Sequence, residues 1–192
     1  MPKTNKLQSM CFLSVRNYCI QSTENYNASN DTLYQIPSSS NFLMGLVVAK
    51  LNELGQLDEM LLGQPPIKVQ HILEMITGKT LHELITKYIF SKINRVNKTI
   101  STHPIKLCKQ SGWISMNDLH VIIMDICKSY NRNSGKILRS SVNFIQNRVG
   151  PFVYDNNKFV HDTWNYGTTM NYTVYPLLGN FDLSLCEYDK KI

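Results

Sequence analysis

The stretch Gly112-Trp113-Ile114-Ser115-Met116-Asn117-Asp118-Leu119 decides the fold that this sequence predicts. Ser115 or Asn117 can cap a following helix, because a short polar side chain accepts a hydrogen bond from the first free backbone amides. Apolar residues then recur at helical spacing, at Leu119, Ile122, Ile123 and Ile126. The polar run from Asn131 to Gly135 ends the helix. We expect Trp113 to be buried where the loop enters this helix, packed with Leu119 and Ile123 as structural core.

A second helix and a hairpin are predicted next. Residues 136–148 place four apolar side chains on one helical face, at Ile137, Leu138, Val142 and Ile145. Gly150-Pro151 ends that helix. Two short extended runs, 152–154 and 158–160, then flank Asp155-Asn156-Asn157, residue types that tolerate the positive φ of a tight turn. Helix, turn, helix and two-stranded wing together predict a winged helix over residues 91–166.

Several residues of this region resemble the N-terminal winged-helix lobe of the tRNA 2′-phosphotransferases. They are Ser91-Lys92, His103-Pro104, the stretch from Gly112 to Leu119, and Phe152 before the turn. Two departures limit what the resemblance implies. The family has an Arg-His pair that ends one residue before the residue preceding this proline, and the two positions are Ser101 and Thr102 here. The family also has an NAD-binding catalytic lobe, for which the 26 residues after Tyr166 are too few. The resemblance therefore implies a lobe without its enzyme.

The remainder of the chain predicts helices flanked by two arms. Residues 41–90 carry helical patterns, and Thr80 with Glu83 three positions later has the spacing of a capping box. Residues 1–40 are polar apart from the patch Met10 to Val15, and residues 167–192 are aromatic without a helical period. We therefore predict a mainly α protein with a helical core, a winged-helix-like second half, and extended N-terminal (1–40) and C-terminal (167–192) arms.

Charge favours binding over catalysis. Between Lys92 and Arg148 stand ten basic residues against two acidic ones, whereas the whole chain carries a formal charge of +6. Arg132, Lys136 and Arg139, around the start of the predicted second helix, could lie against phosphates. A winged-helix protein that binds nucleic acid without enzymatic activity is therefore one hypothesis. The alternative is a basic face that meets acidic segments of neighbouring copies.

No catalytic, cofactor or metal site is expected. The histidines are scattered, and neither a G-x-S-x-G element, a P-loop nor a G-x-G-x-x-G element occurs. The five cysteines contain no C-x-x-C pair or zinc-type spacing. An odd count leaves at least one thiol unpaired in the chain, so Cys11, Cys19 and Cys186 are candidates for intersubunit disulfides, with buried reduced thiols as the alternative.

These features favour a viral structural protein that self-assembles into a dense lattice. Polar and aromatic arms without internal period become ordered against other subunits, and exchange of such arms builds continuous assemblies. The 19 asparagines and 17 isoleucines are typical of an A/T-rich genome. In overall profile the chain resembles the mainly helical occlusion-body proteins (polyhedrins) of insect nudiviruses. Since neither a signal peptide nor a membrane-spanning run is present, we expect a location inside an infected host cell, with copies of itself as partners and no membrane.

Overall fold

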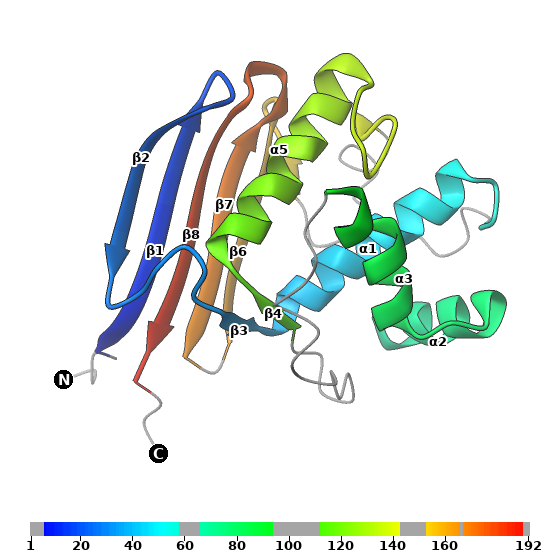
Figure 1. The fold of residues 1–192 in the computed structure, drawn as a ribbon, viewed down its shortest axis with the longest axis horizontal. Helices are drawn as coiled ribbons and strands as arrows, with labels where there is room; N and C mark the ends of the chain where they lie inside the picture. The colour runs from blue at the N-terminus through cyan, green and yellow to red at the C-terminus, as the bar shows by residue number, and fades with distance from the viewer. Residues whose placement is uncertain (1–5, 58–65, 94–111, 143–152, 166, 190–192) are drawn as a thin grey trace.

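The computed structural model describes residues 6–57, 66–93, 112–142, 153–165 and 167–189, and its architecture is dominated by a twisted sheet (Figure 1). The strands are β1 (Leu7–Arg16), β2 (Cys19–Tyr26), β3 (Tyr34–Ile36), β4 (Gly112–Ile114), β5 (Val153–Asp155), β6 (Lys158–Asn165), β7 (Thr168–Tyr175) and β8 (Asn180–Tyr188). The helices are α1 (Pro37–Glu53), α2 (Pro66–Thr77), α3 (Leu81–Tyr88) and α5 (Met116–Arg132), with short 3-10 turns η2 (Phe90–Lys92) and η4 (Pro176–Leu178).

Six strands form one antiparallel sheet in the order β2-β1-β8-β7-β6-β5. The N-terminal strand β1 pairs with the C-terminal strand β8 from Leu7 opposite Tyr188 to Val15 opposite Phe181. β3 and β4 form a separate two-stranded ladder beside the start of α1. The two ends of the chain therefore meet in the interior of the main sheet.

Helix α5 covers one face of this sheet (Figure 1). Its cap is Ser115, whose side chain accepts from the Asp118 amide at 3.1 Å, and it ends at Asn133 in the left-handed conformation. The buried residues of α5 include Leu119, Ile122, Ile123 and Ile126. The facing residues of the sheet alternate with polar ones along each strand, at Cys11, Leu13 and Val15 of β1 and at Phe181, Leu183 and Leu185 of β8. The predicted cap and helix are confirmed.

The other helices pack together beside the sheet. α1 buries Phe42, Leu46 and Val47 and contacts both α3 and β4. The capping box at the start of α3 is confirmed, because Thr80 accepts from the Glu83 amide while the Glu83 carboxylate accepts from the Thr80 amide. Among the described residues, no helix has both the length and the apolar character required to cross a bilayer.

The prediction of a mainly α protein with extended arms is wrong. The 1–40 segment supplies β1, β2 and β3 as well as the start of α1, and the 167–192 segment supplies β7 and β8. In β8, Phe181, Leu183 and Leu185 are buried between partly exposed Asp182 and Ser184, which is the two-residue period of a strand with one covered face. The segments lack a helical period because they are strands, and they are ordered by pairing within their own chain.

The winged-helix prediction for the second half is also wrong. The hairpin around Asp155-Asn156-Asn157 is confirmed, but β6 continues past it and pairs with β7 inside the six-stranded sheet. No helix begins at Lys136. The backbone amides of Lys136 and Ile137 donate instead to the buried Asp125 carboxylate of α5, at distances of 2.8 to 3.1 Å. Residues 143–152 of the expected helix and strand, and His103-Pro104 of the expected module, lie outside the described residues.

Three further hydrogen bonds hold the loop after α5 in place of a helix. The Ser129 hydroxyl donates to the Leu138 carbonyl at 2.8 Å, and the Ser141 hydroxyl donates to the Ile126 carbonyl at 2.7 Å. The amide of Arg139 donates to Glu53 of α1 at 2.6 Å. These bonds use backbone groups that a helix would need, so tertiary contacts override the local helical spacing.

Removal of the Asp125 carboxylate should test this account. We expect Asp125→Ala to lower the free energy of unfolding by about 2–4 kcal/mol, because two amides lose their buried acceptor. Asp125→Asn keeps one acceptor oxygen and should lose less. Urea unfolding followed by circular dichroism measures both. Asp155→Ala, at an exposed aspartate of the hairpin, is the matched control and should change stability by under about 0.5 kcal/mol; an equal loss in the two alanine variants would contradict the role of Asp125.

Candidate functional site

The candidate site is the junction where β3 leads into α1 beside β7, and the sequence holds three consecutive serines there. β3 leads directly into α1, and Pro37 occupies the first helical position, where its missing amide costs nothing. Ser38, Ser39 and Ser40 follow. The Thr168 hydroxyl of β7 donates to the Gln35 carbonyl at 2.7 Å and fixes the end of β3 against the sheet. The junction of β3 and α1 is thereby held beside β7.

Aromatic side chains of β6 and β7 pack against α1 next to this junction. His161 lies directly opposite Tyr172 in the ladder, and their rings stack with centroids 5.0 Å apart. Phe159 meets Tyr172 edge-on at 6.0 Å, and Phe42 of α1 lies 6.0 Å from the same ring. His161 and Tyr172 are only 4% and 2% exposed. This packing joins the first turns of α1 to the sheet.

The chemistry that these groups can perform follows from their burial. Desolvation raises the pKa of the Tyr172 hydroxyl well above its ordinary value, so the ring stays neutral at physiological pH. Asp162 is the next residue after His161, but neighbouring residues of a strand point to opposite faces, and Asp162 is exposed while His161 is buried. The two therefore cannot form a catalytic His-Asp pair. Proline at the first helical position was the signal in the sequence for the start of α1.

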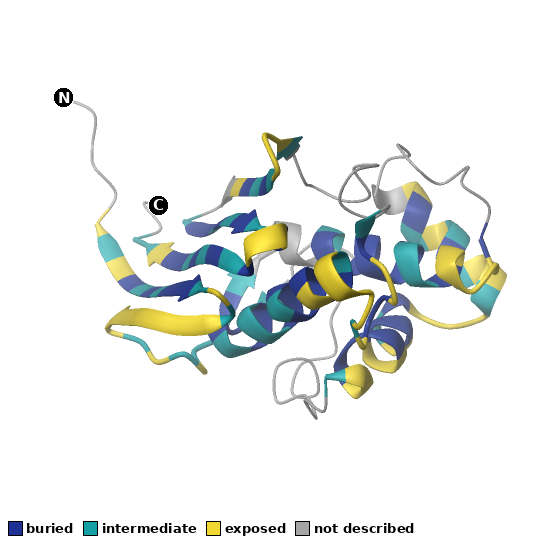
Figure 2. Cartoon of the chain, turned by 90° about the horizontal axis from the view of Figure 1, so that it is seen from above, coloured by how far each residue is buried: buried dark blue, intermediate teal, exposed yellow. Residues whose placement is uncertain are grey.

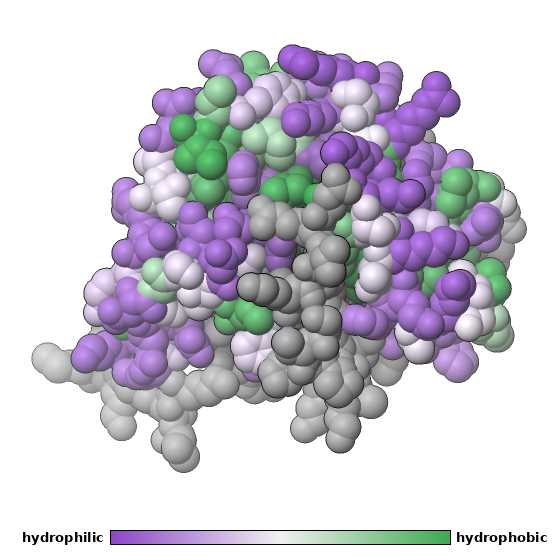
Figure 3. Space-filling view, viewed as in Figure 1, coloured by the Kyte–Doolittle hydropathy of each residue, from purple (hydrophilic) through white to green (hydrophobic). Residues whose placement is uncertain are grey.

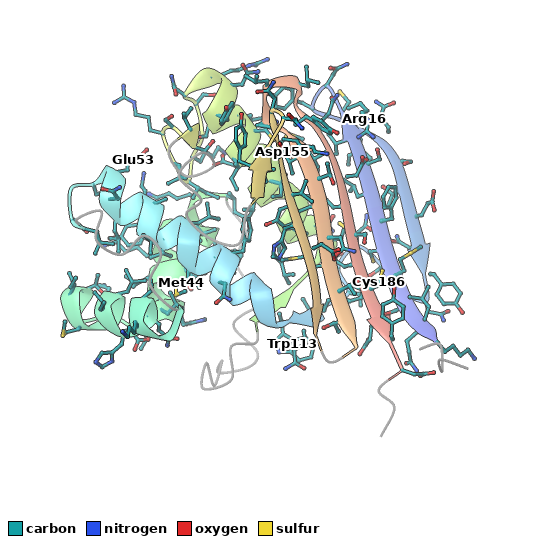
Figure 4. The ribbon with its side chains drawn as sticks, turned by 180° about the vertical axis from the view of Figure 1, so that it is seen from behind. Arg16, Met44, Glu53, Trp113, Asp155 and Cys186 are labelled. Atoms are coloured by element: carbon teal, nitrogen blue, oxygen red, sulfur yellow. The ribbon has the colours of Figure 1, made fainter. Side chains whose placement is uncertain are left out.

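The predicted nucleic-acid contacts lie at the opposite end of the sheet. Arg132 ends α5 with its guanidinium carbon 5.5 Å from the centre of the Tyr18 ring, and exposed Lys136 and Arg139 follow in the loop. Figure 4 shows Arg16 and Asp155 at this end and Trp113 at the end where α1 begins. The structure brings the three basic residues to one end of the molecule. They follow the C-terminal end of α5, where the helix dipole is negative, so the dipole does not attract a phosphate there.

The predicted core residues are divided between two environments. Leu119 and Ile123 are fully buried in the face of α5 that meets the sheet. Trp113 lies in β4 opposite Gln35 and is partly exposed, so its expected full burial is wrong. The reason is strand alternation. The next residue, Ile114, points into the core with no exposed surface, and Trp113 therefore faces the other way.

The predicted disulfide residues are all free thiols. Cys11 and Cys186 are buried on neighbouring strands β1 and β8, and Cys19 is exposed on β2. The Cys11 thiol donates to the Ser29 carbonyl at 3.2 Å, and burial raises its pKa. Cys127 of α5 is also free and buried, and Cys108 lies outside the described residues. Only Cys19, among the three candidates, has the exposure that a bridge to another subunit requires.

Neither a family model nor a curated protein matches this sequence. Several solved structures match the fold. FmtA from Staphylococcus aureus is 12% identical with a TM-score of 0.70, over 97% of this chain and 81% of that one. D-alanine carboxypeptidase AmpC from Burkholderia cenocepacia is 10% identical with a TM-score of 0.66, over 96% and 90%. SurE with D-Leu is 8% identical with a TM-score of 0.65, over 95% and 67%.

These likenesses establish a shared fold and leave function open. The sequence identities are far too low for functional-site residues of those proteins to be assigned to this chain. They are similarities to β-lactamase-like, penicillin-binding-protein-like and SurE structures, whereas the sequence suggested the lobe of tRNA 2′-phosphotransferases and polyhedrins. The matched fold has a sheet with helices, in agreement with the correction of the mainly α prediction.

Thiol reactivity should follow the burial described above. In a Cys108→Ser background we expect one fast reaction with a thiol reagent at pH 8, at Cys19. Burial raises the pKa of Cys127 to about 12, so that thiol stays protonated and covered until the protein unfolds. Adding Cys19→Ser should remove the fast phase and leave the unfolding-limited one. Fast labelling of Cys11, Cys127 or Cys186 in the folded protein, read by peptide mass spectrometry, would contradict these assignments.

Proposed function

We propose that this chain is a non-catalytic binding protein built on a fold that serine enzymes also use. The similar structures include proteins described as β-lactamase and D-alanine carboxypeptidase. Enzymes of the β-lactamase and penicillin-binding classes use a Ser-x-x-Lys element together with S-D-N and K-T-G elements. None of these three elements occurs anywhere in the 192 residues.

The position one helical turn after the serines carries this proposal. In Ser-x-x-Lys the amine lies on the same helix face as the serine hydroxyl, where it can activate the nucleophile. In α1 the residue three positions after Ser38 is Asn41, and Ser39 and Ser40 are followed at that spacing by Phe42 and Leu43. An amide does not take up a proton at neutral pH, and Phe42 and Leu43 are buried core residues. No serine of this turn has a neighbouring base one turn along the helix.

The buried rings of β6 and β7 next to this turn support the same conclusion. His161 is buried and stacked on Tyr172, and Tyr172 stays neutral because its pKa is raised. Both rings serve the packing of α1 on the sheet. Since both rings are covered and no serine of α1 has a base one turn along the helix, binding is proposed in preference to turnover.

The two functions expected from the sequence remain predictions. Self-assembly into a viral lattice was inferred from free arms, and the segments in question are strands of the chain's own sheet. Nucleic-acid binding was inferred from Arg132, Lys136 and Arg139, which are all exposed. Both self-assembly and nucleic-acid binding are compatible with a non-catalytic protein. The free arms that motivated the self-assembly prediction are strands in the structure.

Acylation by a β-lactam tests the proposal directly. After incubation with a fluorescent penicillin at neutral pH, we expect the intact mass of the protein to stay unchanged, because no base activates the serines of α1. Ser38→Ala should behave as the wild type, and so should Ser134→Ala at an exposed serine. A covalent adduct that forms on the wild type and is lost only in Ser38→Ala would show an active nucleophile and overturn the proposal.

A further inference from the structure

Three segments meet at the end of the sheet that lies farthest from the start of α1 (Figure 1). They are the β1–β2 turn up to Ile20, the η4 turn between β7 and β8, and the last turn of α5 with the loop to Lys136; together they are called the tip. The Tyr18 amide donates to the Gly179 carbonyl at 3.0 Å. The Asn131 amide group donates to the Leu177 carbonyl at 3.1 Å and to the Tyr18 hydroxyl at 3.2 Å. These bonds make the tip one ordered surface.

The tip exposes aliphatic side chains. Leu177, Leu178 and Ile20 are 51%, 56% and 53% exposed, and they account for three of the seven large hydrophobic residues found exposed among the described residues. Figure 3 shows apolar patches beside strongly polar surface at this end of the molecule. More than half of the surface of each of these two adjacent leucines stays exposed. Clustered exposed apolar side chains generally mark a surface that meets a partner.

Three exposed cations stand on the α5 segment of the tip. Arg132 stacks over Tyr18, whose ring packs on Gly179, the residue that follows Leu178. Lys128 lies one helical turn before Arg132, Lys136 follows in the loop, and all three are exposed. Of the acidic groups near this end, Asp182 is paired with Arg16 at 2.8 Å, and the buried Asp125 carboxylate accepts from the backbone amides of Lys136 and Ile137. The tip therefore combines exposed aliphatic side chains with three exposed cations.

We propose that the tip binds an anionic lipid surface, with the leucines entering the interface and Lys128, Arg132 and Lys136 facing the headgroups. Apolar and cationic side chains act together at such a surface, whereas phosphates of a nucleic acid would use the cations and leave the leucines in water. The Tyr18 ring is covered by Arg132 on one side and Gly179 on another, so it is not a platform for a base. This inference goes beyond the proposed lack of catalysis and does not depend on it.

Vesicle flotation tests the proposal with the full chain. We expect the protein to float with vesicles of phosphatidylcholine and phosphatidylserine, not with phosphatidylcholine alone, and to be released by salt. Leu177→Ser/Leu178→Ser should abolish flotation. Arg132→Gln/Lys136→Gln should weaken it by at least about tenfold, since each cation near an anionic surface contributes roughly fivefold. Because Arg132 also contacts Tyr18, Lys128→Gln/Lys136→Gln provides a second charge variant without that contact.

Matched control variants distinguish binding through the tip from non-specific binding to vesicles. Met75→Ser/Ile76→Ser removes an exposed apolar pair on α2, and Lys68→Gln/Lys79→Gln removes two exposed lysines elsewhere; both should float like the wild type. Absence of flotation with either vesicle overturns the proposal, and so do tip variants that bind as the wild type does. Retention of a short DNA duplex in a filter assay without vesicle binding also overturns it, in favour of nucleic acid.

Discussion

The antiparallel ladder between β1 and β8 is the constraint on which the rest of the structure depends. It joins residues 7–15 to residues 181–188, so the two ends of the described chain are held side by side within the sheet. Closing so long a loop costs conformational entropy, which must be recovered by burying the side chains of both strands under α5. Leu13 lies opposite Leu183, and both are almost completely buried. Without the β1–β8 ladder, strand β2 would have no neighbour in the sheet and α5 would cover only half of the sheet.

One polar contact lies at the end of the β1–β8 ladder that contains Arg16. Arg16 of β1 donates to both carboxylate oxygens of Asp182 on β8, and the Ser14 hydroxyl donates to the same carboxylate. Burial alone raises the pKa of Asp182, but the hydrogen bonds from Arg16 and Ser14 outweigh it and hold the pKa below its ordinary value. A lowered pKa means that the contact stabilises the fold at neutral pH and is lost on acidification. Both side chains are over one third exposed, so the contribution is small, and burial supplies most of the stability of the ladder.

Local signals in the sequence predicted local structure, and the failures occurred where partners are distant. Ser115 and the apolar spacing that follows specify α5 within one segment, and Thr80 with Glu83 does the same for α3. The alternation of apolar and polar residues in β8 indicates a strand, yet no local feature of the sequence predicts that β1 is its neighbour. β2 is exposed along its whole length (Figure 2), so it carries no apolar pattern at all. The candidate site depends on register as well, because His161 and Tyr172 meet only once β6 and β7 are aligned.

Hydrogen–deuterium exchange of the dilute protein tests the central claim most directly, because free arms and interior strands differ greatly in amide protection. The account predicts that peptides covering β1 and β8 exchange slowly, near the rate set by global unfolding, at every protein concentration. The exposed edge strand β2 should exchange faster. Exchange of β1 and β8 within seconds, or protection that appears only as the protein concentration rises, would contradict the account and restore the ends of the chain as arms that order against other subunits.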